Sequence, residues 1–191
     1  MSKQLFFIAI LPPLEVQRSA NEIEHYFAEI YNSKAALKSP PHITLQSPFY
    51  WETDRLKKLK TVLAEFSRQQ IFIPIILDGF AVFKPRVIYI NVRKTPELLA
   101  VQKALMQQLE LSLNIVHRAS KTRPFTPHMT VGFKDLTKAN FYRAWEEFQD
   151  KSFDAIFTAS ELTLLQFNGK KWEIDSEFCL SNGIAVAIIR L

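Results

Sequence analysis

One five-residue frame occurs twice in this chain of 191 residues and constrains how the chain folds. Pro-His-Ile-Thr-Leu begins at Pro41, and Pro-His-Met-Thr-Val begins at Pro127. Two of the four histidines of the chain, His42 and His128, lie in these frames. We therefore expect an internal duplication, in which each half of the chain contributes one copy of the frame.

Polar and apolar residues alternate within both frames. A period of two is typical of a half-buried β-strand, whose successive side chains point to opposite faces. We expect one face of each strand to be reachable from solvent and the other to belong to the core. The exposed face is predicted to carry His42, Thr44, His128 and Thr130, and the core face Ile43, Leu45, Met129 and Val131.

The remaining elements follow from periodicity and from turn residues. Apolar residues recur every three or four positions in four segments, which predicts helices over residues 14–31, 54–69, 95–111 and 138–149. Thr95-Pro96 supplies an N-cap and a first-turn proline for the third helix, and Thr53 or Asp54 is expected to cap the second. Further strands are predicted over residues 5–11, 71–83 and 87–92, and a hairpin over 161–167 and 172–180 with Asn168-Gly169 as its turn.

These elements predict an α+β fold. Strands and helices do not alternate strictly and hairpin signals are present, which favours antiparallel sheet over a doubly wound parallel sheet. The order strand, helix, His-containing strand, helix occurs once in each half, which indicates a bilobal, pseudo-two-fold duplicated unit with outer helices and a central cleft. The chain has only four glycines and no Ser- or Gly-rich run, so we expect one domain over residues 1–191, with interleaved lobes and no linker.

Composition points to a well-packed globule with a basic surface. Hydrophobic residues make up 48% of the chain, and 16 residues are Phe. The 24 Lys and Arg against 19 Asp and Glu leave a net charge of +5, which suits a phosphate-rich partner such as RNA or a nucleotide but is also common among other enzymes. The charge alone does not decide between them.

Two further features bear on the compartment. Cys179 is the single cysteine, so no intrachain disulfide can form; we expect a small core residue in a reducing cytoplasm. The apolar run at residues 5–11 is followed by Pro12-Pro13 and an acidic amphipathic stretch, so we interpret it as a buried strand rather than a signal peptide. The apolar segment 183–191 is too short to cross a bilayer, and no membrane association is expected.

The spacing within each frame suits phosphate chemistry. His and Thr two apart on a strand have Cα atoms about 6.5–7 Å apart on one face, so an imidazole and a hydroxyl can reach the same phosphate. Two such pairs facing each other across a groove would supply one base and one acid, which needs no metal. The sequence contains no His-Glu-x-x-His motif and no His/Cys cluster, so no metal site is expected.

The two frames resemble the paired His-x-Thr-hydrophobic signatures of the two-histidine (2H) phosphoesterase superfamily. Within it, the chain is similar to the branch of 2′-5′ RNA ligases and cyclic phosphodiesterases. The resemblance extends over nearly the whole chain, since residues 5–10 are like the first strand of that branch, residues 85–90 like a middle strand, and residues 125–128 like the entry to the second motif. It implies a bilobal α+β fold with a central cleft and metal-independent chemistry on 2′,3′-cyclic phosphates or 2′-5′ linkages of RNA or nucleotides.

The resemblance also implies roles for individual residues. His42 and His128 are the acid/base pair, and Thr44 and Thr130 orient the phosphate; which histidine is the base stays open. Arg123, in the approach to the second motif, is a further candidate for a phosphate contact. Gln46 shares the parity of His42 and is a candidate lining residue. Phe49, Tyr89 and Phe125 are candidate rings for stacking on a base. His25 and His117 are expected to be ordinary surface residues.

Three functional hypotheses remain after the sequence is considered. The first is a cyclic phosphodiesterase or 2′-5′ RNA ligase-like enzyme, a hydrolase that acts as a cytoplasmic monomer without cofactor. The second is a nucleotide- or RNA-binding protein that uses the same cleft without turnover. The third treats the frames as scaffold, because a strand-starting proline, a rim histidine and a β-favouring threonine also have structural uses. Substrate size, and hydrolysis versus ligation, stay open.

Overall fold

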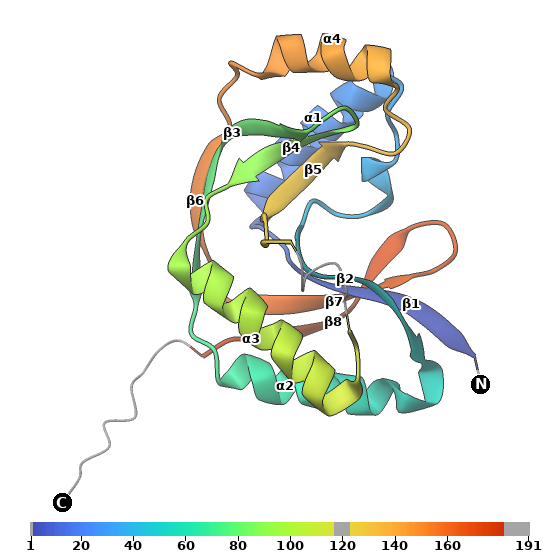
Figure 1. Cartoon of the computed structure of the whole chain (residues 1–191), viewed down its shortest axis with the longest axis vertical. Helices are drawn as coiled ribbons and strands as arrows, with labels where there is room; N and C mark the ends of the chain where they lie inside the picture. The colour runs from blue at the N-terminus through green and yellow to red at the C-terminus, as the bar shows by residue number, and fades with distance from the viewer. Residues whose placement is uncertain (1, 117–122, 182–191) are drawn as a thin grey trace, which may run out of the picture.

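The computed structural model describes residues 2–116 and 123–181, and in these residues two four-stranded antiparallel sheets make up the centre of the fold (Figure 1). The first sheet has the order β2-β1-β7-β8 and the second the order β5-β4-β3-β6. The strands of the first sheet are β1 (Lys3–Ile10), β2 (Ile43–Glu52), β7 (Glu161–Phe167) and β8 (Trp172–Cys179). Those of the second are β3 (Ile73–Phe83), β4 (Val87–Val92), β5 (His128–Gly132) and β6 (Asp154–Ala159).

Helices connect the strands and cover the sheets. The α-helices are α1 (Leu14–Ile30), α2 (Leu56–Arg68), α3 (Pro96–Leu113) and α4 (Lys138–Phe148), and 3₁₀ turns occupy Ala36–Lys38 and Thr53–Arg55. The predicted start of α3 is confirmed, since the Thr95 side chain accepts a hydrogen bond from the backbone N–H of Leu98. The predicted cap of α2 is wrong, because that helix begins after a 3₁₀ turn and no side chain caps it.

The two halves of the chain exchange their helices. Helix α1 connects β1 to β2 of the first sheet, yet it packs against β5 of the second. Helix α3 connects β4 to β5 of the second sheet, and it packs against β2 of the first sheet as well as β3 of the second. Figure 1 shows the result, with α1 and α4 beside the second sheet and α2 and α3 beside the first. Each half therefore depends on the other to bury its own sheet.

The core lies mainly between the helices and the sheets. The aliphatic residues of both frames are buried as predicted, at exposures of 0% for Ile43, Met129 and Val131 and 3% for Leu45. The side chains of His42, Thr44, His128 and Thr130 are half-buried. A second, smaller apolar cluster consists of Phe7, Ala9 and Leu165, with Leu11 and Trp172 packed against it. Phe7 of this smaller cluster also contacts the ring of His42.

The structure differs from the sequence predictions in two further respects. Strand β6 was not predicted; its alternation is weak because Ile156, on its solvent side, is 80% exposed. Cys179 is exposed rather than in the core, because its side chain has the opposite parity to those of its buried neighbours Phe178 and Leu180. The predicted hairpin is confirmed, with residues 168–171 connecting β7 to β8 and Asn168 and Gly169 among them. His117 and the segment 183–191 lie outside the described residues.

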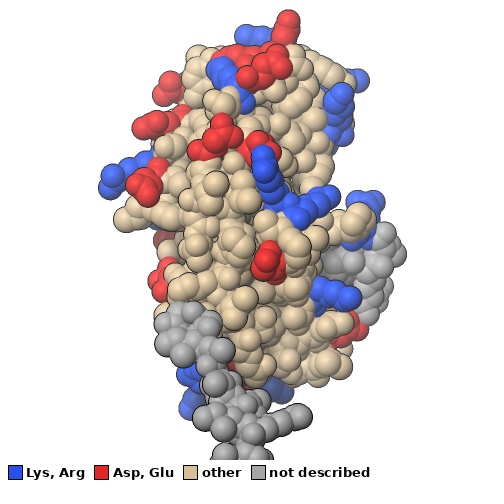
Figure 2. Space-filling view, turned by 90° about the vertical axis from the view of Figure 1, so that its left-hand side faces the viewer, with Lys and Arg blue, Asp and Glu red and all other residues tan. Residues whose placement is uncertain are grey.

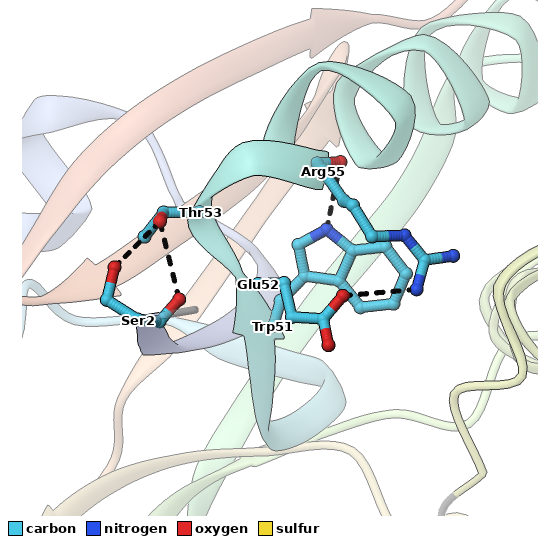
Figure 3. Close-up of polar contacts among 5 residues, drawn as sticks. All are labelled: Ser2, Trp51, Glu52, Thr53 and Arg55. Carbon is cyan, nitrogen blue, oxygen red and sulfur yellow. Dashed lines mark hydrogen bonds and ion pairs between the residues drawn. The ribbon is translucent and has the colours of Figure 1, made fainter.

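Side chains tie the end of β2 to the chain terminus and to the turn that follows (Figure 3). The Trp51 indole Nε1 donates to the carbonyl oxygen of Arg55 at 3.0 Å, and the Arg55 guanidinium forms an ion pair with Glu52 at 3.2 Å. Thr53 contacts the Ser2 hydroxyl at 2.8 Å. These contacts hold the C-terminal end of β2 in place, at the opposite end from the first motif.

Charges of both signs are interspersed over the face shown in Figure 2, and no single-sign patch covers it. Within the described part of the chain, no helix is both long and apolar enough to cross a membrane.

Glu24 is a buried acid on the face of α1 that packs against the second sheet. It is 2% exposed, its Oε2 atom has no hydrogen-bond partner, and burial raises its pKa from 4.5 to about 8. Between pH 4.5 and 8 the Glu24 carboxyl therefore stays protonated in the folded state but is ionised in the unfolded state. This group consequently lowers the free energy of unfolding as the pH rises through that window.

We predict that Glu24→Gln removes this pH dependence. The difference in unfolding free energy between variant and parent should grow in favour of the variant by up to about 1.4 kcal/mol per pH unit across that window. Urea unfolding of both proteins at a series of pH values measures it, with the exposed Glu22→Gln as the matched control. A difference that stays constant with pH would show that Glu24 ionises normally in the folded protein.

Candidate active site

Both motif histidines are held by the same hydrogen bond. His42 Nδ1 lies 2.7 Å from the carbonyl oxygen of Pro40, and His128 Nδ1 lies 2.7 Å from the carbonyl oxygen of Thr126. A carbonyl oxygen only accepts, so Nδ1 carries the hydrogen in both rings. The neutral form of each ring then has its lone pair on Nε2, which is the atom left to exchange a proton with a ligand.

The proline in each frame explains this geometry. Pro41 and Pro127 lie between the histidine and the carbonyl that binds it. Proline fixes its own φ angle and keeps the preceding residue extended, which limits where that carbonyl can point. The prolines had been expected only to start the strands, so their part in orienting the imidazoles is a role that sequence reasoning missed.

A β-bulge follows the threonine in both motif strands. In the first sheet Ala9 pairs with Thr44 but Ile8 pairs with Gln46, so Leu45 is the extra residue. In the second sheet Tyr89 pairs with Thr130 but Ile88 pairs with Gly132, so Val131 is the extra residue. The irregularity thus falls at the same position of both frames. A bulge bends the strand and interrupts its alternation, so parity read from the histidine holds only as far as the threonine.

Gln46 lies beyond the bulge, so the parity with His42 that made it a candidate lining residue no longer applies. Its side chain is 2% exposed, its amide donates to the carbonyl of Ser47 at 2.8 Å, and its Oε1 atom has no partner. It is not among the residues that line the cavity described below. Gly132 holds the equivalent position in the second motif, where a Cβ atom would come within 2.6 Å of the Phe27 ring of α1.

Aromatic rings pack against both imidazoles. The His42 ring lies 4.7 Å from the Phe7 ring, centroid to centroid. The His128 ring contacts Phe83 edge-on at 5.0 Å and Tyr89 at 5.2 Å. These aromatic contacts, together with the Nδ1 hydrogen bond, hold the orientation of each imidazole and shield it from water.

Burial makes both histidines poor proton acceptors in the free protein. Desolvation lowers the pKa of His42 from 6.5 to about 4; its hydrogen bond to the Pro40 carbonyl opposes this shift, and the positive charge of His128 lowers the pKa further. Desolvation also lowers the pKa of His128, against its hydrogen bond to the Thr126 carbonyl. The charge on one ring is therefore felt by the other, as expected for two imidazoles that serve one site.

A cavity of about 590 Å³ adjoins the motif strands. Thr44 of β2 and His128 of β5 both line it, so it receives residues from both sheets, and Arg123 lines it as well. His42 and Thr130 are not among its lining residues, although β2 and β5 lie in contact. The remaining lining residues are Leu45, Ser47, Phe83, Gln102, Met106, Pro124, Phe125 and Thr126.

Helix α3 contributes two lining residues that the sequence did not single out, Gln102 and Met106. The Gln102 amide, buried on the core-facing side of α3, donates to the carbonyl of the bulge residue Leu45 at 3.3 Å. This hydrogen bond satisfies a carbonyl that the bulge removes from the sheet ladder. The only available signal was a glutamine near the apolar stripe of the helix.

The other candidate residues lie in different environments. Phe125 lines the cavity, Tyr89 is 5% exposed and contacts the His128 ring, and Phe49 packs against the core. His25 is an exposed residue of α1, as expected. Among residues 2–116 and 123–181, no group of three or more His, Cys, Asp or Glu side chains is arranged to hold a metal ion.

Comparisons with known proteins identify the family of this chain. Residues 12–171 match the family model described as the 2′-5′ RNA ligase superfamily. A Geobacillus kaustophilus protein named "Putative phosphoesterase" is 30% identical over 175 residues, which cover 90% of this chain and 93% of that protein. A Bacillus cereus protein of the same name is 26% identical over 179 residues, which cover 92% and 96%.

Solved structures show the same fold. Escherichia coli LigT complexed with 3′-AMP superposes with a TM-score of 0.69 at 21% identity, covering 94% of this chain and 99% of LigT. TT0787 of Thermus thermophilus superposes with a TM-score of 0.67 at 17% identity, covering 95% of this chain and 100% of that protein. The extent of the family match, together with the two equivalent histidines, places this chain in the 2′-5′ RNA ligase superfamily, among the two-histidine phosphoesterases.

Proposed function

We propose that this protein is a phosphoesterase that acts on 2′,3′-cyclic phosphates or 2′-5′ phosphodiester linkages of RNA or nucleotides by two-histidine acid/base catalysis. The observation that carries the proposal is the shared orientation of the two imidazoles, each bound through Nδ1 to a carbonyl two residues upstream. Each ring thereby presents Nε2 for proton transfer. The electrostatic influence of His128 on His42 supports a single site.

Hydrolysis of a cyclic phosphate by this route needs only water and the two histidines. The neutral histidine accepts a proton from water at Nε2 while the water oxygen forms a bond to phosphorus. The bond from phosphorus to one ribose oxygen breaks, and the protonated histidine donates its Nε2 proton to that oxygen. The product is a phosphomonoester with a free hydroxyl, and one final proton exchange returns the two rings to their starting states.

Substrate charge provides the protonated ring. Both imidazoles are neutral at pH 7 in the free protein, because burial lowers the pKa of each. A phosphate anion in the cleft opposes this effect and favours a proton on one of them. Thr44 and Thr130 are proposed to donate hydrogen bonds to non-bridging phosphate oxygens, and Arg123, at the cavity wall, to contact a neighbouring phosphate.

Known ligands of a structural neighbour support a nucleotide in the cleft. Escherichia coli LigT has been crystallised with 3′-AMP, ATP, NADP⁺ and phosphate. The cavity of about 590 Å³ falls within the range of small-molecule sites, and Phe83 and Phe125 give it apolar walls. We propose that the substrate carries a nucleotide, that the protein works in the cytoplasm as a monomer without a metal, and that both lobes act as one unit.

We predict that His42→Ala and His128→Ala each lower kcat by about 10²- to 10⁴-fold, the contribution usual for a positioned acid or base. A panel of 2′,3′-cyclic nucleotides and 2′-5′-linked oligonucleotides, assayed in EDTA, measures this loss. His25→Ala, on the surface of α1, is the matched control and should keep full activity. Full activity of both motif variants on every substrate the parent accepts would refute the mechanism, and tight binding without any turnover by the parent would favour a non-catalytic nucleotide-binding protein.

The pH dependence of kcat/KM should be bell-shaped with its optimum below about pH 6.5. The free enzyme needs one protonated and one neutral histidine, and this state is most populated between the two apparent pKa values of the pair. Both pKa values are lowered from 6.5, so activity should fall toward higher pH as the acid loses its proton. A rate that is constant or still rising between pH 7 and 8 would contradict this assignment.

A further inference from the structure

A row of aromatic rings leads away from His42 across the first sheet. Phe7 of β1 lies against the His42 ring at 4.7 Å, and Trp172 of β8 lies edge-on against Phe7 at 4.6 Å. Phe167 of β7 follows at 5.2 Å from Trp172. Phe7 is 2% exposed and belongs to the apolar cluster of this sheet, whereas Trp172 and Phe167 are only partly buried. The two outer rings therefore keep surface that a ligand can reach, next to the candidate active site.

The row ends at the tip of the hairpin between β7 and β8, which is the loop at the right of Figure 1. The Asn168 side-chain oxygen accepts from the backbone N–H groups of Lys170 and Lys171, both at 2.9 Å, and the Asn168 N–H donates to the Lys171 carbonyl at 3.0 Å. Gly169 has a φ angle of +95°, which the turn requires and which L-residues rarely adopt. The tip is thus held in one conformation before any ligand binds.

Two lysines project from this ordered tip. Lys170 and Lys171 are exposed, and Lys171 Nζ lies 3.4 Å from Glu173 in an ion pair whose partners are 63% and 51% exposed. A pair this exposed is weak and is readily exchanged for a contact with phosphate. The tip of the hairpin therefore combines aromatic faces with two lysines, whereas β8 itself carries Glu173, Asp175 and Glu177. Aromatic rings beside lysines are the combination that binds single-stranded nucleic acid without base-specific contacts.

The β7–β8 hairpin has no counterpart at the same position of the second sheet. By strand order, β7 and β8 of the first sheet correspond to β3 and β6 of the second. Those two strands are not consecutive in the chain and no hairpin joins them. The His128 side of the cleft instead has the turn between β3 and β4, where Phe83 contacts the His128 ring and the exposed Lys84 and Arg86 carry charge.

We propose that Trp172, Phe167 and the lysines of the β7–β8 hairpin bind the nucleotides adjoining the reacting phosphate, so that the substrate class is the end of a single-stranded RNA rather than a mononucleotide. This inference rests on the proposed function and extends it. Bases stack on the partly exposed rings, and Lys170 and Lys171 contact the phosphates that follow.

The test compares two substrates that differ only in the adjoining strand, which are 2′,3′-cyclic AMP and an RNA hexamer ending in a 2′,3′-cyclic adenylate. The measured quantity is the ratio of kcat/KM for the hexamer to that for the mononucleotide. Trp172→Ala should lower this ratio on the order of 10-fold, as expected for the loss of one stacked base, and Trp172→Phe should restore most of it. Lys170→Ala/Lys171→Ala should lower the ratio and weaken its dependence on salt.

Matched controls separate this role from general effects of charge and stability. Lys57→Ala/Lys58→Ala removes the same charge from the exposed face of α2, and Tyr142→Ala removes an exposed ring from α4; both should leave the ratio at the parent value. Equal losses on both substrates in Trp172→Ala would show that the ring only supports His42 through Phe7, and would overturn the inference. A parent ratio near one would overturn it as well.

Failure of the proposed function gives a different result. If the parent turns over neither substrate, the catalytic proposal fails, and fluorescence anisotropy with the same hexamer then measures binding directly. Weaker binding to both hairpin variants, with the two control variants unchanged, would still support the RNA surface. Equal affinity of all variants for the hexamer would exclude it.

Discussion

The candidate site depends on one short hydrogen bond made twice, from an imidazole Nδ1 to the carbonyl two residues upstream. It selects the tautomer that leaves Nε2 available, and the intervening proline restricts where the accepting carbonyl can lie. Neither His42 nor His128 needs a carboxylate partner for orientation. The same bond partly offsets the burial that lowers the pKa of each ring, so one contact sets both direction and proton affinity.

The exchange of helices gives this arrangement its rigidity. Because α1 covers β5 and α3 covers β2, each motif strand is supported by a helix from the opposite half of the chain. Gln102 of α3 reaches the Leu45 carbonyl beside Thr44, and Phe27 of α1 fills the space above Gly132. A displacement of one half would therefore disturb the motif strand of the other, which ties the geometry of the cleft to the integrity of the whole core.

Much of this architecture could be predicted from the sequence, because strand alternation and helix capping depend only on neighbouring residues. Alternation placed Ile43 and Met129 in the core, and Thr95-Pro96 marked the start of α3. The bulges could not be predicted, since Leu45 and Val131 are ordinary strand residues and the extra residue becomes evident only from the pairing partner. The swapped helices and the contact of Gln102 were equally hidden, because both depend on which distant segments meet.

The position of the two bulges also affects how the protein behaves among copies of itself. Strands β2 and β5 are edge strands, and an unbroken edge offers free N–H and C=O groups to which a second chain can add. An extra residue in each edge bends it and spoils the regular spacing that such an addition needs. The same irregularity that ends the run from histidine to threonine thus makes both edge strands poor templates for a strand from another molecule.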